Sequence, residues 1–511
     1  MRARTDIAGF LDSPMKRNLF IVVVFSGGHA LTAPPISWAP LQLILWALLL
    51  RTLDERTSAR MSMMVFWLAG FGAQFIMGLG VQRGFANLWN LPPVTGWVPL
   101  LMVSAWAAIP LGLFGAITPA IQRTLRHWWP LALAPVWVIV NGRFPAVFAN
   151  GIEHHWVDWA RMMGAVSVFG PVAPTMIVLG GAGYLSGMQD RKWIDHRSTR
   201  WSLALYGLLV IGIVVTGHTR VETVRTSWNE GPTMRLALIQ PNIHPKQRQA
   251  HLEEDPSGIG VFLIEQTRTV LAQSQGVDAV VWPENVIFGS PLRREHDALR
   301  QLALEFGVEL WLGGISLEQS PQGIAIRTNS AHRIRSDGTV AERYDKRRLL
   351  LGAETVPWAK QGVGYQRGRR ELTHELGDAR FAFLICYEAT DNKRMRASQS
   401  RGAAAVINLS SDALFASEWL AIHHLALVRL QAASIGMPVV RVATTGTSAV
   451  IDGLGQVHQQ IGWDQKGSLV VDVPTGSAGA LTGIAQYSWL VCLGITVIAM
   501  GLVGVRRRRS R

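Results

Sequence analysis

Three short stretches of the chain carry residue types that together can perform acyl transfer. Glu284 stands in a Trp-Pro-Glu stretch, Lys346 in Tyr-Asp-Lys, and Cys386 in Cys-Tyr-Glu. A thiolate can attack a carbonyl carbon, a carboxylate can take and return the proton, and a fixed ammonium can stabilise the charge that develops on oxygen. We therefore expect an enzyme with Glu284, Lys346 and Cys386 as its catalytic residues.

Two of these residues are unremarkable when each is taken alone. Glu284 follows an apolar run, 277–282, that predicts a strand, and we expect Pro283 to close this strand because proline cannot donate to a ladder. A carboxylate there can point into a pocket, although a lone glutamate at a strand end is usually a surface residue. Lys346 opens a basic run that, by itself, is typical of a solvated surface.

The cysteine occupies a more informative position. Cys386 directly follows the apolar run 381–385, which predicts a buried strand, so the thiol would stand at a strand-to-turn corner with a backbone amide nearby for an oxyanion. A lone cysteine more often packs as a small apolar residue. The other cysteine, Cys492, belongs to the last apolar block, which argues against a disulfide between the two.

Further polar residues near the trio are candidates for supporting roles. Glu354 and Glu388 are carboxylates that can pair with Lys346 and orient it. Tyr387, which directly follows the cysteine, is a third candidate for a supporting role. The histidine pairs at 154–155 and 423–424 lack further ligands at metal-binding spacing, so we expect neither a metal nor a cofactor.

The composition indicates a protein that is partly embedded in lipid. Of 511 residues, 49% are hydrophobic and only 16% charged, and the mean hydropathy is +0.20. The length allows two or more domains. Apolar runs of membrane-spanning length predict eight spans: 18–34, 37–50, 62–82, 98–119, 129–149, 162–186, 201–217 and 485–505.

The basic residues predict the orientation of these spans. The net charge of +14 is concentrated beside the apolar blocks, which indicates topology and contact with lipid headgroups rather than binding to nucleic acid. Alternate loops are basic, starting from a cytoplasmic N-terminus and ending at the arginine-rich tail. This alternation of basic loops predicts that the soluble segment 218–483 lies outside the cytoplasm.

The soluble segment alternates between the patterns of strands and helices, which predicts a layered α/β domain. The expected strands are 236–239, 277–282, 309–315, 381–385, 404–409, 438–443 and 446–451, and the expected helices are 258–275, 294–306 and 417–435. A hairpin is expected to turn at the Ser-Asp-Gly sequence 336–338.

The three catalytic stretches resemble the signatures of the nitrilase superfamily of carbon–nitrogen hydrolases, and nearly the whole chain resembles its membrane-bound branch, the apolipoprotein N-acyltransferases. The resemblance implies a multi-span α-helical membrane bundle plus an α/β nitrilase-like αββα sandwich. The implied domains are a membrane domain of about seven helices over 1–217, a catalytic domain over 218–483, and a closing helix with a basic tail over 484–511. Glu354 follows the lysine at the spacing where that family carries a further essential glutamate.

The resemblance also implies a reaction and its partners. Cys386 would take an acyl chain from a phospholipid as a thioester, and the N-terminal amine of a diacylglyceryl-cysteine lipoprotein would then accept it. The protein would lie in the bacterial inner membrane as a monomer, with its catalytic domain in the periplasm. A related membrane acyltransferase or amidase with another acceptor, such as a plasmid conjugal-transfer protein, stays open as an alternative.

Overall fold

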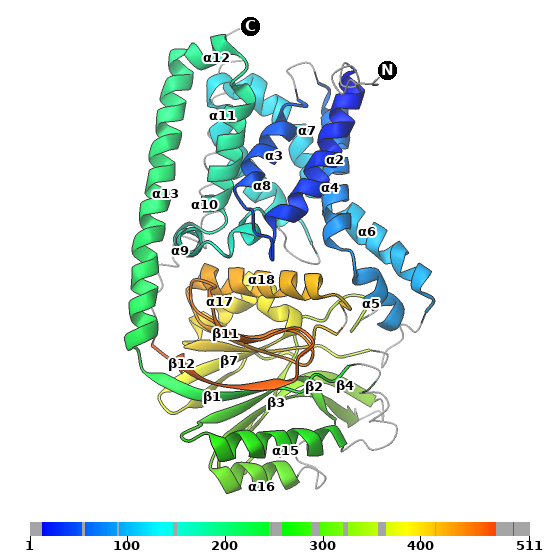
Figure 1. Cartoon of the computed structure of the whole chain (residues 1–511), viewed down its shortest axis with the longest axis vertical. Coiled ribbons are helices and arrows are strands. Elements are labelled where there is room, and N and C mark those ends of the chain that lie inside the picture. Colours follow the sequence, from blue (N-terminus) through cyan, green and yellow to red (C-terminus); the bar gives the residue numbers. More distant parts are fainter. Residues whose placement is uncertain are drawn as a thin grey trace, which may run out of the picture. The chain divides into compact units, whose positions relative to one another are not determined.

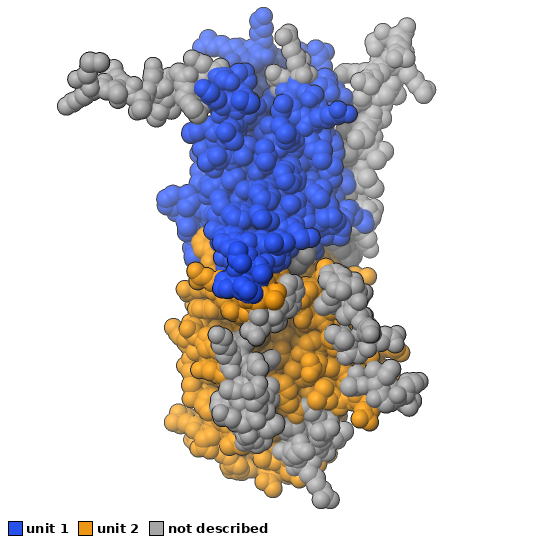
Figure 2. All heavy atoms as spheres, turned by 90° about the vertical axis from the view of Figure 1, so that its right-hand side faces the viewer, with its two compact units in different colours: residues 1–82, 92–220, 481–511 blue, residues 83–91, 221–480 orange. Residues whose placement is uncertain are grey.

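The chain divides into two compact units. The computed structural model describes residues 13–53, 57–88, 91–146, 151–244, 247, 258–288, 297–319, 325–355, 364–413, 415–476 and 494. Unit 1 comprises residues 1–82, 92–220 and 481–511, and unit 2 comprises 83–91 and 221–480 (Figure 2). The division therefore falls within one long helix, α13 (Arg197–Glu230), a few residues past the boundary predicted at 217.

All the regular secondary structure in the described residues of unit 1 is helical (Figure 1). Its longer helices are α2 (Pro14–Thr32), α3 (Leu41–Leu50), α4 (Ala59–Met77), α6 (Trp97–Ala107), α7 (Ile109–Leu125), α8 (Trp129–Arg143), α9 (Ala160–Phe169) and most of α13. Shorter pieces are η1 (Pro93–Gly96), η2 (Arg126–Trp128), η3 (Glu153–Trp156), α10 (Val172–Thr175), η4 (Met176–Gly180), α11 (Gly181–Gly187) and α12 (Arg191–Asp195). A further helix, α5 (Val81–Leu88), crosses the boundary into unit 2.

Several of these helices are long and apolar enough to cross a membrane. Among the described residues they are Ala59–Met77, Pro93–Arg143 and Arg197–Glu230, with the bent pair Ala160–Phe169 and Val172–Gly187 as a fourth if it forms one span. They overlap five of the predicted spans. The predicted span at 18–34 coincides with α2, which is not among these helices, and 37–50 corresponds to the short apolar helix α3. Of the predicted span at 485–505 only residue 494 is described. The number of spans stays a prediction.

Unit 2 is built on two six-stranded mixed sheets. The first has the order β12-β1-β2-β3-β4-β5 and the second β11-β10-β9-β8-β7-β6. The first consists of β1 (Thr233–Gln240), β2 (Ala279–Phe288), β3 (Glu309–Gln319), β4 (Ala325–Ile334), β5 (Tyr344–Asp345) and β12 (Gly467–Pro474). The second consists of β6 (Thr373–Leu376), β7 (Ala379–Ile385), β8 (Ala405–Ser410), β9 (Val439–Ala443), β10 (Ser448–Ile451) and β11 (Val457–Ile461). Strands β1, β2 and β3 are parallel, as are β7, β8 and β9.

The two sheets stack face to face between two layers of helices (Figure 1). Side chains of both sheets, such as Leu238, Trp311 and Phe383, form one buried cluster between them. A second cluster joins the outer face of the first sheet to α15 (Gly258–Gln273) and α16 (Asp297–Phe306). Helices α17 (Asn392–Ser400) and α18 (Glu418–Ile435) pack on the outer face of the second sheet. The predicted αββα sandwich is confirmed.

Candidate active site

Glu284 lies in an irregular stretch of β2. The sequence predicted that this strand ends at Pro283, and that prediction is wrong because β2 continues to Phe288. Pairing with β3 is interrupted after Trp282 and resumes at Ile287. Proline has no N–H for the ladder, which explains the interruption, and a bulge of this kind re-aims the side chains it contains. The bulge also carries Asn285 at a positive φ of 61°.

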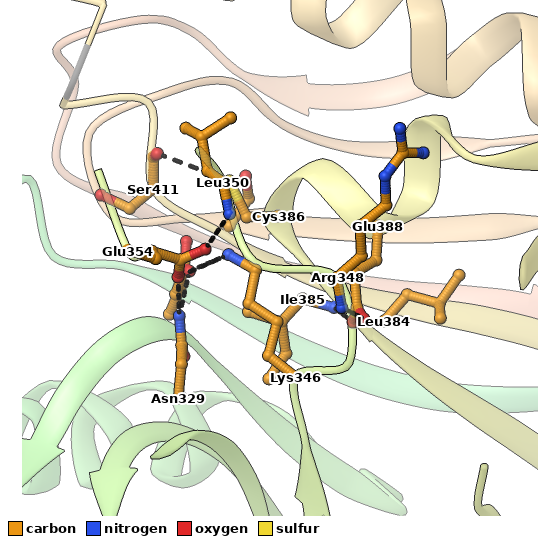
Figure 3. A network of polar contacts seen from close by, with 12 residues as sticks. Asn329, Lys346, Arg348, Leu350, Glu354, Leu384, Ile385, Cys386, Glu388 and Ser411 are labelled. Atoms are coloured by element: carbon orange, nitrogen blue, oxygen red, sulfur yellow. Dashed lines mark hydrogen bonds and ion pairs between the residues drawn. The ribbon is translucent and has the colours of Figure 1, made fainter. Parts of the chain in front are cut away.

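The Lys346 ammonium is buried against two carboxylates. Its Nζ donates to Glu284 Oε1 at 3.2 Å and to Glu354 Oε1 at 2.8 Å. Lys346 directly follows β5, and its backbone N–H donates to the carbonyl of Asn329 on β4. Figure 3 shows this ammonium turned toward Glu354 and Asn329, with Cys386 on a neighbouring turn.

Asn329 is a member of the site that the sequence analysis did not identify. Its Nδ2 donates to Glu284 Oε1 at 2.7 Å and to Glu354 Oε1 at 2.9 Å, so one amide links both carboxylates. The side chain is fully buried in β4. The available signal was a run of polar residues, 328–330, that the strand buries, since buried polar groups require partners.

These contacts shift the acid–base properties of the site. Burial raises the pKa of Glu284, although the Lys346 ammonium opposes the shift. Burial disfavours the Lys346 ammonium, but the Glu284 and Glu354 carboxylates outweigh that effect and hold the pKa of Lys346 well above its ordinary value. The pair therefore combines a permanently charged cation with a carboxylate that binds a proton more readily than usual, as general acid–base chemistry requires.

Cys386 begins the 3₁₀ turn η6 (Cys386–Thr390) at the carboxyl end of β7. Its φ of 51° lies in the left-handed region that non-glycine residues rarely adopt. Burial raises the pKa of the thiol to about 12, and Sγ lies 3.9 Å from the carbonyl oxygen of Ser411. The charges of Glu284 and Lys346 both act on this thiol. The cysteine is thus a neutral thiol at neutral pH.

The hydrogen-bond partners of Glu388 differ from the expected one. The sequence suggested that it pairs with Lys346, but its carboxylate instead accepts hydrogen bonds from the backbone that follows that lysine. Oε1 accepts from the N–H groups of Arg347 at 2.7 Å and Arg348 at 2.9 Å. Oε2 accepts from the Ile385 N–H at 3.0 Å. One fully buried carboxylate thereby joins the lysine segment to the cysteine turn.

Tyr387 is buried directly after the cysteine, with its ring 4.5 Å from the Arg348 guanidinium. Such a cation–π contact stabilises both groups. Tyr387 therefore packs against the same lysine segment. The described residues contain no group of three or more His, Cys, Asp or Glu side chains that could hold a metal ion.

The structure thus groups the half-buried Cys386 with the buried Glu284 and Lys346, and Glu354 lies beside the lysine. Glu284 and Lys346 come from the first sheet and Cys386 from the second. The catalytic roles of these residues stay predictions.

The fold of unit 2 is that of a nitrilase-type carbon–nitrogen hydrolase, and the family model described as carbon-nitrogen hydrolase matches residues 235–482. Relatives extend the similarity to most of the chain. Apolipoprotein N-acyltransferase of Bradyrhizobium diazoefficiens is 30% identical over 436 residues, which cover 78% of each chain. That of Allorhizobium ampelinum is 28% identical over 503 residues, 88% of this chain and 89% of that one.

The chain belongs to the apolipoprotein N-acyltransferase family. Together with its apolar helices, this membership makes it a membrane-bound protein. A solved nitrilase-superfamily structure, that of Nit3 from Saccharomyces cerevisiae, is 17% identical with a TM-score of 0.38, and the match covers 48% of this chain and 92% of that one.

Proposed function

We propose that this protein transfers an acyl chain from a phospholipid to the N-terminal amine of diacylglyceryl-cysteine lipoproteins, through a thioester on Cys386. The proposal is supported by membership of the family. The observation that carries the chemistry is the cluster in which the Lys346 ammonium, 3.2 Å from Glu284 Oε1, lies beside the turn that carries the half-buried Cys386 (Figure 3).

In the first half-reaction Glu284 takes the proton of Cys386, and the thiolate attacks the carbonyl carbon of a phospholipid ester. Lys346, with a backbone amide beside the cysteine, stabilises the negative charge on the tetrahedral oxygen. The C–O bond then breaks, and the leaving lysophospholipid takes the proton from Glu284. The raised pKa of Glu284 suits this return of the proton.

In the second half-reaction the lipoprotein amine attacks the thioester carbonyl and gives a proton to Glu284. The C–S bond breaks, an amide forms, and Cys386 regains its proton from Glu284. Two sequential steps suit two substrates that are both anchored in lipid, because each can reach the cysteine in turn. The site would face the periplasm from the inner membrane, in accordance with the basic loops.

The test uses the full-length protein in mixed micelles of detergent and phosphatidylethanolamine. We expect the intact mass to rise by one acyl chain on Cys386, and the chain to move to a synthetic diacylglyceryl-cysteine peptide when this is added. Cys386→Ser should form no thioester, and the same peptide with an acetylated amine should accept nothing. A thioester that ignores the free-amine peptide would reject the lipoprotein acceptor, and a protein that is never acylated would reject the mechanism.

A further inference from the structure

A second polar network lies behind the cysteine turn, entirely within unit 2. Asn408 on β8 donates from Nδ2 to two backbone carbonyls, those of Leu384 at 3.1 Å and Cys386 at 3.2 Å. Its Oδ1 accepts from Arg441 Nη1 at 2.9 Å. The amide therefore joins the backbone of the cysteine to a guanidinium on the next strand, β9.

The guanidinium is held in turn by a carboxylate. Arg441 Nη2 donates to both oxygens of Asp412 at 2.7 Å, and His424 Nδ1 lies 2.8 Å from Asp412 Oδ1. Asn408, Asp412 and Arg441 are completely buried. Burial opposes ionisation of Asp412, yet Arg441 and His424 overcome it and lower the pKa of Asp412 to about 2. The network is thus ionic at neutral pH.

A buried ion pair is rarely a device for stability, because desolvation of the charges offsets much of their attraction. A role in fixing the backbone at Cys386 explains the Asp412–Arg441 ion pair better than a role in stability. Cys386 has an unfavourable φ of 51°, and a strained residue keeps its conformation only where its surroundings fix it. Asn408 holds the carbonyl of Cys386 itself and that of Leu384, two residues earlier in the chain. Ser411, whose carbonyl lies 3.9 Å from Sγ, immediately precedes Asp412.

We propose that Asp412, Arg441 and His424 are positioning residues for the nucleophile: they orient Asn408, which holds the backbone of Cys386 in the conformation that presents its thiol. The inference rests on the proposed function only in taking Cys386 as the residue that is acylated. The positioning role requires neither a particular acyl donor nor a particular acceptor.

The most direct variant is Asn408→Asp. Aspartate has the same shape and keeps an acceptor for Arg441, but it cannot donate to the carbonyls of Leu384 and Cys386. The assay is the burst of p-nitrophenolate from p-nitrophenyl butyrate, a small ester that reports acylation of the cysteine whatever the natural donor. The full-length protein carries Cys492→Ser, so that Cys386 is its single thiol.

We expect the burst rate to fall about 10- to 100-fold in Asn408→Asp, the range in which a misplaced reacting group slows a reaction. The ester concentration that gives half of the maximal rate should change by less than about threefold, because binding is not affected. Arg441→Lys, which keeps the charge but loses the forked donor geometry, should show a smaller loss of the same kind.

The matched control is Arg333→Lys. Arg333 forms a buried pair with Glu309 in the first sheet, with Nε 2.7 Å from Oε2, and contacts neither the cysteine turn nor Asn408 through that pair. Its variant should lower the unfolding temperature about as much as Arg441→Lys while leaving the burst unchanged.

The outcomes separate the two proposals. A burst that Asn408→Asp and Arg441→Lys leave at the parental rate overturns the positioning role, and so does a loss that Arg333→Lys reproduces. A parent protein without any burst overturns Cys386 as the nucleophile and the positioning role with it. A normal burst in a protein that phospholipid never acylates rejects the proposed function but leaves the positioning role supported.

Discussion

The carbonyl oxygen of Pro283 occupies the space into which a side chain on Gly313 would have to grow. A Cβ built on Gly313 would lie 2.1 Å from that oxygen and 2.7 Å from the Cα of Glu284. Real atoms do not approach so closely, so the bulge that carries Glu284 fits against β3 only because residue 313 is glycine. The position of the proposed base therefore depends on a residue of the adjacent strand.

Gly313→Ala should displace the bulge and with it the Glu284 carboxylate. We expect acylation of Cys386 to slow about 100-fold, since a shift of about 1 Å at a reacting group can have that effect. The measurement is the single-turnover rate of thioester formation. Gly260→Ala is the control, because a Cβ there meets no atom within 4 Å. Equal rates in the two variants would contradict this account of the bulge.

The acidic limb of the pH profile of the acylation rate should report the ionisation of Glu284. The carboxyl accepts a proton only when ionised, and its pKa is raised above the ordinary 4.5, so the acylation rate should fall as pH drops through a midpoint above 4.5. The Glu354 charge contributes to raising that pKa and the Lys346 charge to lowering it. Glu354→Gln should thus move the midpoint to lower pH, and Lys346→Met should move it to higher pH.

Both variants will also be slower than the parent, but the direction of the shift does not depend on the absolute rate. Glu342→Gln, at an exposed pair with Arg370, should leave the midpoint unchanged. Shifts of Glu354→Gln and Lys346→Met in the same direction would show that Glu284 is not the titrating group.

Glu388→Ala should destabilise unit 2 strongly. It removes the acceptor of the backbone N–H groups of Ile385, Arg347 and Arg348, and each buried donor left without a partner costs about 1–3 kcal/mol. We expect the free energy of unfolding to fall by about 3–5 kcal/mol, measured as the thermal midpoint in detergent. Glu375→Ala, which breaks only an exposed pair with Arg380, should change it by less than about 1 kcal/mol. An equal fall of the thermal midpoint in Glu388→Ala and Glu375→Ala would refute the linking role of Glu388.

Asn329→Asp should make the stability of the protein depend on pH in a new way. The variant places a third carboxylate beside Glu284, Glu354 and the single Lys346 ammonium, so burial and repulsion raise the pKa of the new group. Asn329→Asp should be most destabilised at pH values above that raised pKa, where the new carboxyl is charged. The loss of stability should shrink as the pH falls through that pKa. Thermal midpoints at pH 8 and pH 5 test this, and the half-buried Asn392→Asp, which faces Arg396, should show no such trend.

The sequence predicted those parts of the domain whose signals are local. The apolar run before Cys386 identified β7 and the corner where the thiol lies. The helix expected at 417–435 and the strands expected at 404–409 and 438–443 correspond in the same way to α18, β8 and β9. By contrast, β5 has only two residues, and no pattern of that length carries a signal.

The remaining parts depend on contacts between residues far apart in the chain. Asn329 belongs to the site through Glu284 and Glu354, 45 and 25 residues away, and nothing in its immediate neighbours indicates either partner. The continuation of β2 beyond Pro283 likewise depends on β3, which offers pairing again at Ile287. Glu388 was recognised as a supporting residue, but its partners proved to be the Tyr344 hydroxyl and three backbone N–H groups, and backbone groups leave no mark in a sequence.

The division of the cluster between two sheets makes the chemistry sensitive to how the layers are stacked. Strands advance about 3.3 Å per residue, so a slip of one layer over the other by a single residue would exceed the 2.7 and 2.9 Å bonds by which Glu388 joins the cysteine turn to the lysine segment. Such a slip would leave the hydrogen bonds within each sheet intact and still separate the sulfur of Cys386 from its proposed base. On heating, loss of turnover should therefore precede any loss of secondary structure, and the acylation rate would report how the two sheets are aligned.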